Sequence, residues 1–119
     1  MNRILAVVLR FSGVTSSQPV LEKRLGCAVD RFGDGYAQID ISLGKDEEWG
    51  VINSCLIKRG ASIRQMLDEQ VVTAVQLDVA YGVAEDLVGI SRTVPARTAA
   101  LAGSDGIDVT ITLYRTDES

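Results

Sequence analysis

The side chains of this sequence that could do chemistry are mainly carboxylates, with two thiols and no imidazole. Without histidine, the chain cannot build a Ser-His-Asp or Cys-His site, and the usual zinc and iron sites lose their main ligand. Cys27 and Cys55 lack the CxxC spacing of metal and redox sites, so we expect them to be small buried hydrophobes. We therefore predict a protein that is not an enzyme and that holds no cofactor and no metal ion.

Three similar segments each place an aspartate among alternating apolar and polar residues. They are residues 38–43, 76–81 and 107–113, which contain Asp40, Asp78 and Asp108. Side chains on a strand alternate between two faces, so these segments predict a sheet with one buried face and one wet, acidic face. If their strands are neighbours, the carboxylates form a stripe. Such a stripe rarely converges enough to bind Ca²⁺ or Mg²⁺, whereas it can dock a basic protein. A solvated polar face is the alternative interpretation.

A second acidic group stands directly before the single tryptophan. Asp46, Glu47 and Glu48 precede Trp49. An exposed tryptophan beside charges is a frequent interface hot spot, although a lone tryptophan is also a common core residue. We predict a partner-binding surface made from both acidic groups. Its residues are Asp40, Asp46, Glu47, Glu48, Trp49 and Asp78.

Length and charge narrow the class of protein. The 119 residues suffice for one core, and we expect a single domain over residues 1–119. A net charge of −4 disfavours nucleic-acid binding, because such surfaces need clustered lysine and arginine. The strongest apolar run, residues 4–9, is far shorter than the roughly 20 residues of a membrane helix. No small-residue cleavage site follows this run, so we expect a cytoplasmic location without membrane contact.

Apolar periodicity and turn residues divide the chain into short elements. Residues 3–11 are apolar at nearly every position, which predicts a central strand buried on both faces. Residues 33–35, Gly-Asp-Gly, predict a hairpin turn, and Ser62 with Gln65 has the spacing of a capping box at a helix start. The predicted strands are residues 3–11, 29–32, 36–43, 49–57, 75–81, 87–90 and 107–113. The predicted helices end at Leu25, begin at Ser62 and span residues 96–102.

This order of elements predicts an α+β fold. We expect a ferredoxin-like βαββαβ core with an extra β-α-β unit, in a mainly antiparallel sheet with helices packed on one face. Odd-numbered residues of the three aspartate segments would then face the helices, and even-numbered residues would face solvent.

The C-terminal third carries a family resemblance. Val94-Pro95, the alanine-rich helix up to Leu101-Ala102, residues 106–109 and the late Tyr114 resemble the closing pattern of a bacterial family known only as a domain of unknown function. A helix ending at Leu25-Gly26 and Trp49 fit the same outline. Small acidic cytoplasmic proteins of this kind are often encoded beside polymorphic or contact-dependent toxins as immunity proteins, so the resemblance implies a role of that type.

These observations lead to a main hypothesis and two alternatives. The main hypothesis is a non-enzymatic protein-binding module, an immunity protein that neutralises a basic, nuclease-like toxin through its acidic surface. The first alternative is a module that senses a small molecule or regulates in response to one. The second is a homodimer that hides its sheet face.

Overall fold

A computed structural model describes residues 3–43, 48–84 and 93–116. The strands are β1 (Arg3–Ser12), β2 (Arg31–Gly33), β3 (Tyr36–Asp40), β4 (Ala74–Ala84) and β5 (Ile107–Thr116). The helices are α1 (Gln18–Leu25), α2 (Glu48–Asp68) and α3 (Ala96–Ser104). Within these ranges, no helix combines the length and apolarity needed to cross a bilayer.

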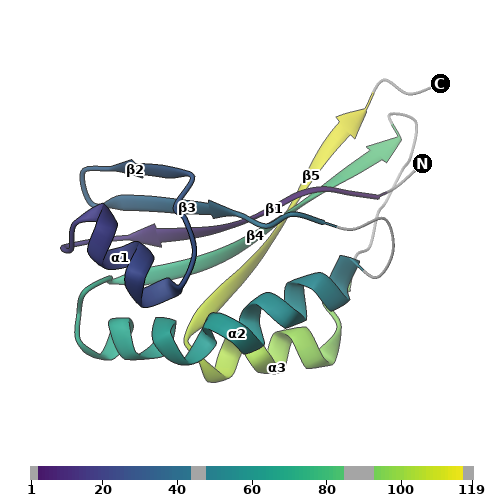
Figure 1. The fold of residues 1–119 in the computed structure, drawn as a ribbon. Helices are drawn as coiled ribbons and strands as arrows, with labels where there is room; N and C mark the ends of the chain where they lie inside the picture. The colour runs from purple at the N-terminus through teal and green to yellow at the C-terminus, as the bar shows by residue number, and fades with distance from the viewer. Residues whose placement is uncertain (1–2, 44–47, 85–92, 117–119) are drawn as a thin grey trace.

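The strands form one sheet in the order β2-β3-β1-β4-β5, and the three helices lie on one side of it (Figure 1). All neighbouring strands are antiparallel except β4 and β5, which are parallel and connected through α3. The predicted α+β fold and the mainly antiparallel sheet are therefore confirmed. The finer assignment, a ferredoxin-like core with an extra β-α-β unit, stays a prediction.

The core lies between the sheet and the helices. From the sheet, Leu9 and Phe11 of β1 and Leu77 and Val79 of β4 are fully buried. The fully buried residues of the helices include Leu21 of α1, Ala102 of α3 and, on α2, Ile52, Leu56, Ile63 and Met66. Most odd-numbered strand residues enter this core as the alternation predicts, and β1 is the central strand.

Local sequence features fix the first helix and the hairpin. The Ser17 Oγ accepts a hydrogen bond from the Val20 N–H at 3.4 Å and caps α1, which ends at Gly26 with a φ of 74°. Gly35 has a φ of 69° in the turn between β2 and β3. Both positive φ angles suit glycine, so the predicted helix end and hairpin are confirmed.

The prediction for residues 49–57 is wrong. These residues are not a strand but the start of α2, which continues through Gly60 and Ser62 to Asp68. Gly60 does not end an element. A Cβ there would lie 2.0 Å from Asp105 Oδ2, so glycine lets α2 pass close to the turn before β5.

One further difference lies near the end of a strand, and one prediction is not tested. Leu113, predicted to face the core, is 45 % exposed near the far end of β5. The predicted strand at residues 87–90 lies outside the described residues.

Candidate protein-binding face

β1 is covered by helices on one face only, although its sequence is that of a strand buried on both. Leu9 and Phe11 point into the core, whereas Leu5 is 41 % exposed and Ala6 is also exposed. The register between β1 and β4 shifts between Ile4 and Ala6, and such a bulge resets the alternation of side chains. Two consecutive residues of β1 therefore face solvent on the side of the sheet that carries no helix. We call this side the uncovered face.

Two shallow hollows flank these exposed residues. One, of about 320 Å³, is lined by Leu5, Ala6, Val8, Arg10, Asp78, Ala80 and Tyr114. The other, of about 410 Å³, is lined by Leu5, Ala6, Val7, Val8, Asp40, Ile41 and Leu43. Small side chains make room for the first hollow, since Ala6 pairs with Ala80 beside the half-exposed Tyr114. The uncovered face thus has an apolar centre on β1 with a hollow on either side.

The three aspartates do not form the predicted stripe. Asp40 and Asp78 lie in the same row, but Val8 of β1 stands between them because β1 separates β3 from β4. Asp108 pairs with Gln76, one row further along the sheet. Each of the first two aspartates instead borders one of the two hollows.

Asp78 is already paired within the chain. Arg10 Nη1 donates to Asp78 Oδ2 in an ion pair, and Thr112 Oγ1 donates to Asp78 Oδ1 at 3.1 Å. The hydrogen bond to Asp78 raises the pKa of Arg10, while partial burial works against it. Asp78 therefore offers little unbalanced charge to a basic partner.

Asp40 ends a second polar chain along β3. Tyr36 Oη donates to Gln38 Oε1 at 2.5 Å, and Gln38 Nε2 donates to Asp40 Oδ1 at 2.8 Å. No cation of the described residues pairs with Asp40. Because its side chain is exposed, Asp40 remains available to a cation from outside.

The remaining predicted site residues lie elsewhere. Trp49 is partly buried on α2 and packs against the core, on the side of the sheet opposite Asp78. Glu48 is the first residue of α2. Asp46 and Glu47 lie outside the described residues. The structure therefore does not unite the tryptophan with Asp78 on one surface.

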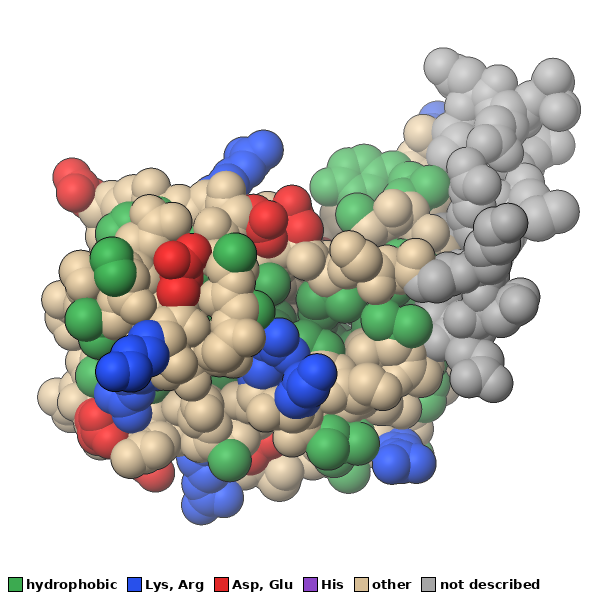
Figure 2. All heavy atoms as spheres, in the orientation of Figure 1, with side chains coloured by type: hydrophobic (Ala, Val, Ile, Leu, Met, Phe, Trp, Pro, Cys, Tyr) green, Lys and Arg blue, Asp and Glu red, His purple; other side chains and the backbone are tan. Residues whose placement is uncertain are grey.

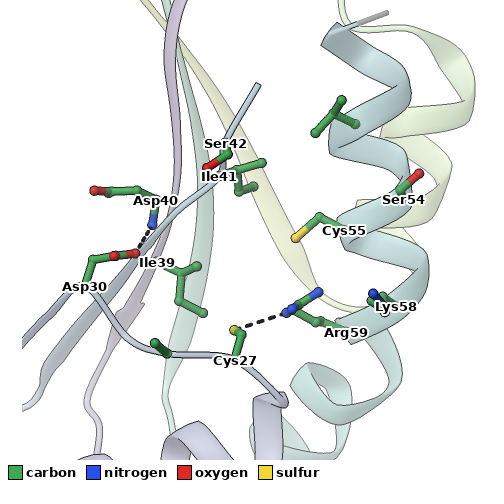
Figure 3. Close-up of a pocket in the computed structure, with 12 residues that line it drawn as sticks. Cys27, Asp30, Ile39, Asp40, Ile41, Ser42, Ser54, Cys55, Lys58 and Arg59 are labelled. Atoms are coloured by element: carbon green, nitrogen blue, oxygen red, sulfur yellow. Dashed lines mark hydrogen bonds between the residues drawn. The ribbon is translucent and has the colours of Figure 1, made fainter. Parts of the chain in front are cut away.

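A further hollow, of about 380 Å³, opens on the helix side of the sheet between α2 and β3. Cys27, Cys55, Lys58 and Arg59 line it together with Ile39 of β3 and Ile41 directly after it (Figure 3). Burial raises the pKa of the Cys55 thiol, and the nearby Arg59 partly offsets this rise. Sequence reasoning did not find this site, because Cys27 and Cys55 are distant in the chain and share no motif.

Comparisons of the chain with protein-family models, with curated proteins and with solved structures find no match. The family resemblance of the C-terminal third therefore stays a prediction.

Proposed function

We propose that the chain is a protein-binding module that docks its partner on the uncovered face. The observation that carries the proposal is the mismatch at β1, whose apolar sequence suits burial on both faces while helices cover only one. An apolar centre with polar residues around it is the usual composition of a protein interface. Leu5, Val8 and Tyr114 supply the apolar centre, and Asp40 and Arg10 supply polar groups at its edge.

The partner that suits this face has an apolar projection next to a lysine or arginine. The projection would fill the hollow beside Leu5, and the cation would meet Asp40, which no described cation neutralises. Charge complementarity of this kind speeds association and selects partners. A basic bacterial toxin fits the description, and the net charge of −4 favours it, so we propose an immunity protein as the specific role.

The test pairs the purified chain with the product of a toxin gene encoded beside it. We expect the wild-type chain to bind this toxin in calorimetry and to restore growth of cells that express it. Leu5→Asp should weaken binding at least tenfold, because it places a carboxylate in the apolar centre of the interface. The matched control is Ile57→Asp, since Ile57 is 56 % exposed on α2, away from the uncovered face.

Each outcome decides one part of the proposal. A wild-type chain that neither binds nor protects would refute the role as an immunity protein. Equal losses in both variants, or binding unaffected by Leu5→Asp, would refute docking on the uncovered face. A wild-type dimer that Leu5→Asp converts to a monomer would show that a second copy of the chain covers this face instead.

A further inference from the structure

The hollow between α2 and β3 has an apolar floor and a basic wall. Ile39 of β3 and Ile41, the residue directly after this strand, point toward α2, and Cys55 and Arg59 of α2 point back toward them (Figure 3). Figure 2 shows this region as a depression below the sheet, with basic side chains beside hydrophobic ones. Its volume of about 380 Å³ lies within the range of small-molecule sites.

Arg59 lacks the carboxylate partner that Arg10 and Arg24 have. Arg10 pairs with Asp78 and Arg24 pairs with Glu69, whereas Arg59 Nε donates to Cys27 Sγ at 3.2 Å. The terminal nitrogens of Arg59 have no carboxylate acceptor within the described ranges. A guanidinium whose terminal nitrogens lack a carboxylate acceptor presents two parallel N–H groups. This geometry binds a carboxylate with two hydrogen bonds.

The acidic residues that border the hollow direct their carboxylates elsewhere. Asp30 Oδ2 accepts the Asp40 N–H at 2.6 Å, and Asp40 Oδ1 accepts from Gln38. Figure 3 shows both carboxylates on the side of β3 that faces away from α2. The space in front of Arg59 therefore contains a cation and apolar groups but no competing anion from these two residues. Lys58, exposed on the rim, adds a second positive charge.

We propose that this hollow binds a small organic anion, a carboxylate with a short apolar chain. The carboxylate would accept hydrogen bonds from Arg59 with Lys58 nearby, and the chain would lie on Ile39, Ile41 and Val51. This hollow opens on the opposite side of the sheet from the proposed docking face, and Asp40 and Ile41 at the edge of the sheet border the hollows of both sites. Binding at this hollow would supply the small-molecule sensing of the alternative function. The hollow lies next to β3, and Asp40 of β3 borders the docking face.

The first test is a titration with hexanoate, followed by backbone amide shifts in nuclear magnetic resonance spectra. We expect saturable shifts concentrated at Cys27, Ile41 and Arg59, and none with hexylamine, which has the same chain and the opposite charge. Arg59→Gln should weaken hexanoate binding at least tenfold. The matched control is Lys23→Gln, which removes a positive charge from an exposed site on α1 and should leave binding unchanged.

A second readout uses the thiols. Cys27 and Cys55 are the only cysteines of the chain and both line the hollow, so alkylation by neutral iodoacetamide reports on its occupancy. Saturating hexanoate should slow alkylation at least threefold in the wild-type chain and not in Arg59→Gln. If Arg59→Gln fails to fold, Lys58→Gln replaces it, because Lys58 is exposed; several-fold weaker binding is then expected.

Three results would overturn the site. The first is the absence of saturable hexanoate binding up to a ligand concentration of about 50 mM, which is far weaker than millimolar affinity. Inorganic phosphate could bind as tightly as hexanoate, which would refute the role of the apolar floor. Shifts could spread equally to Arg10 and Lys23, which would indicate non-specific anion binding. Leu5→Asp should leave hexanoate binding intact, so failure of the docking proposal and failure of this one are distinguishable.

Discussion

Both faces of the sheet carry large apolar side chains, but only one face buries them. On the covered face, Leu9 and Leu77 are completely buried against helices. On the uncovered face, Leu5 and Tyr114 are 41 % and 50 % exposed around a hollow. β1 therefore carries more apolar residues than the chain's own core buries. The excess lies together on one surface, and this is why we propose that a partner covers that surface.

The hydrogen bonds of the two faces also differ in how much water reaches them. On the helix side, Thr98 of α3 is fully buried and its Oγ1 donates to Asn53 Oδ1 of α2 at 2.5 Å. On the uncovered face, the Thr112 hydroxyl donates to Asp78, which solvent also reaches. A lost hydrogen bond is replaced by water only where water has access. The first hydrogen bond should therefore stabilise the fold more than the second.

The largest expected effect comes from adjacent residues of β1. Leu9→Ala should lower the free energy of unfolding by about 2–5 kcal/mol, because Leu9 is completely buried and the change leaves a cavity in the core. Val8→Ala, one residue away on the uncovered face, should lower it by less than about 1 kcal/mol. Urea denaturation of both variants measures the difference. Equal losses would mean that the uncovered face contributes to the core and would remove the contrast between the two faces.

A smaller effect is expected for the two threonines. Thr98→Val keeps the shape of the side chain but leaves the Asn53 oxygen without this donor, and should cost about 1–3 kcal/mol. Thr112→Val should change stability by no more than about 0.5 kcal/mol, because Arg10 still pairs with Asp78. Thermal unfolding of the pair checks this ranking. The reverse order would show that the polar network on the uncovered face is a structural element in its own right.

The fold could be predicted where short-range features determine it. The helix end at Leu25, the turn at Gly35 and the alternation in β4 each depend on a few neighbouring residues, and all are confirmed. Residues 49–57 of α2 have the sequence character of a strand because they are rich in branched residues, and Gly60 resembles a stop before the helix predicted from Ser62. Gly60 is explained only by the close approach of Asp105, 45 positions later in the chain.

The candidate surfaces depend on strand order, which local patterns do not encode. Asp40 and Asp78 are correctly expected on the uncovered face, but their separation by β1 follows from long-range pairing. The role of Leu5 depends on a bulge in β1, and the hollow at Arg59 depends on α2 being a helix. Besides the two aspartates, the length of the apolar run at residues 4–9 is a sequence feature that points to the proposed docking face.

The smallest expected effect tests how well the covered face excludes water at its edge, where Cys55 borders the hollow. Burial raises the pKa of the Cys55 thiol in the folded chain, so the unfolded chain loses this proton first as the pH rises. The wild-type chain should therefore lose stability relative to Cys55→Ser once the pH passes the ordinary thiol pKa, and the loss should stop growing above the raised pKa. Below that window, the difference between the two chains should not depend on pH. Urea midpoints between pH 7 and 10, measured with a reductant present, follow both chains. Parallel curves across this range would show that water reaches Cys55 freely, and that the cover provided by α2 is already incomplete at the mouth of the hollow.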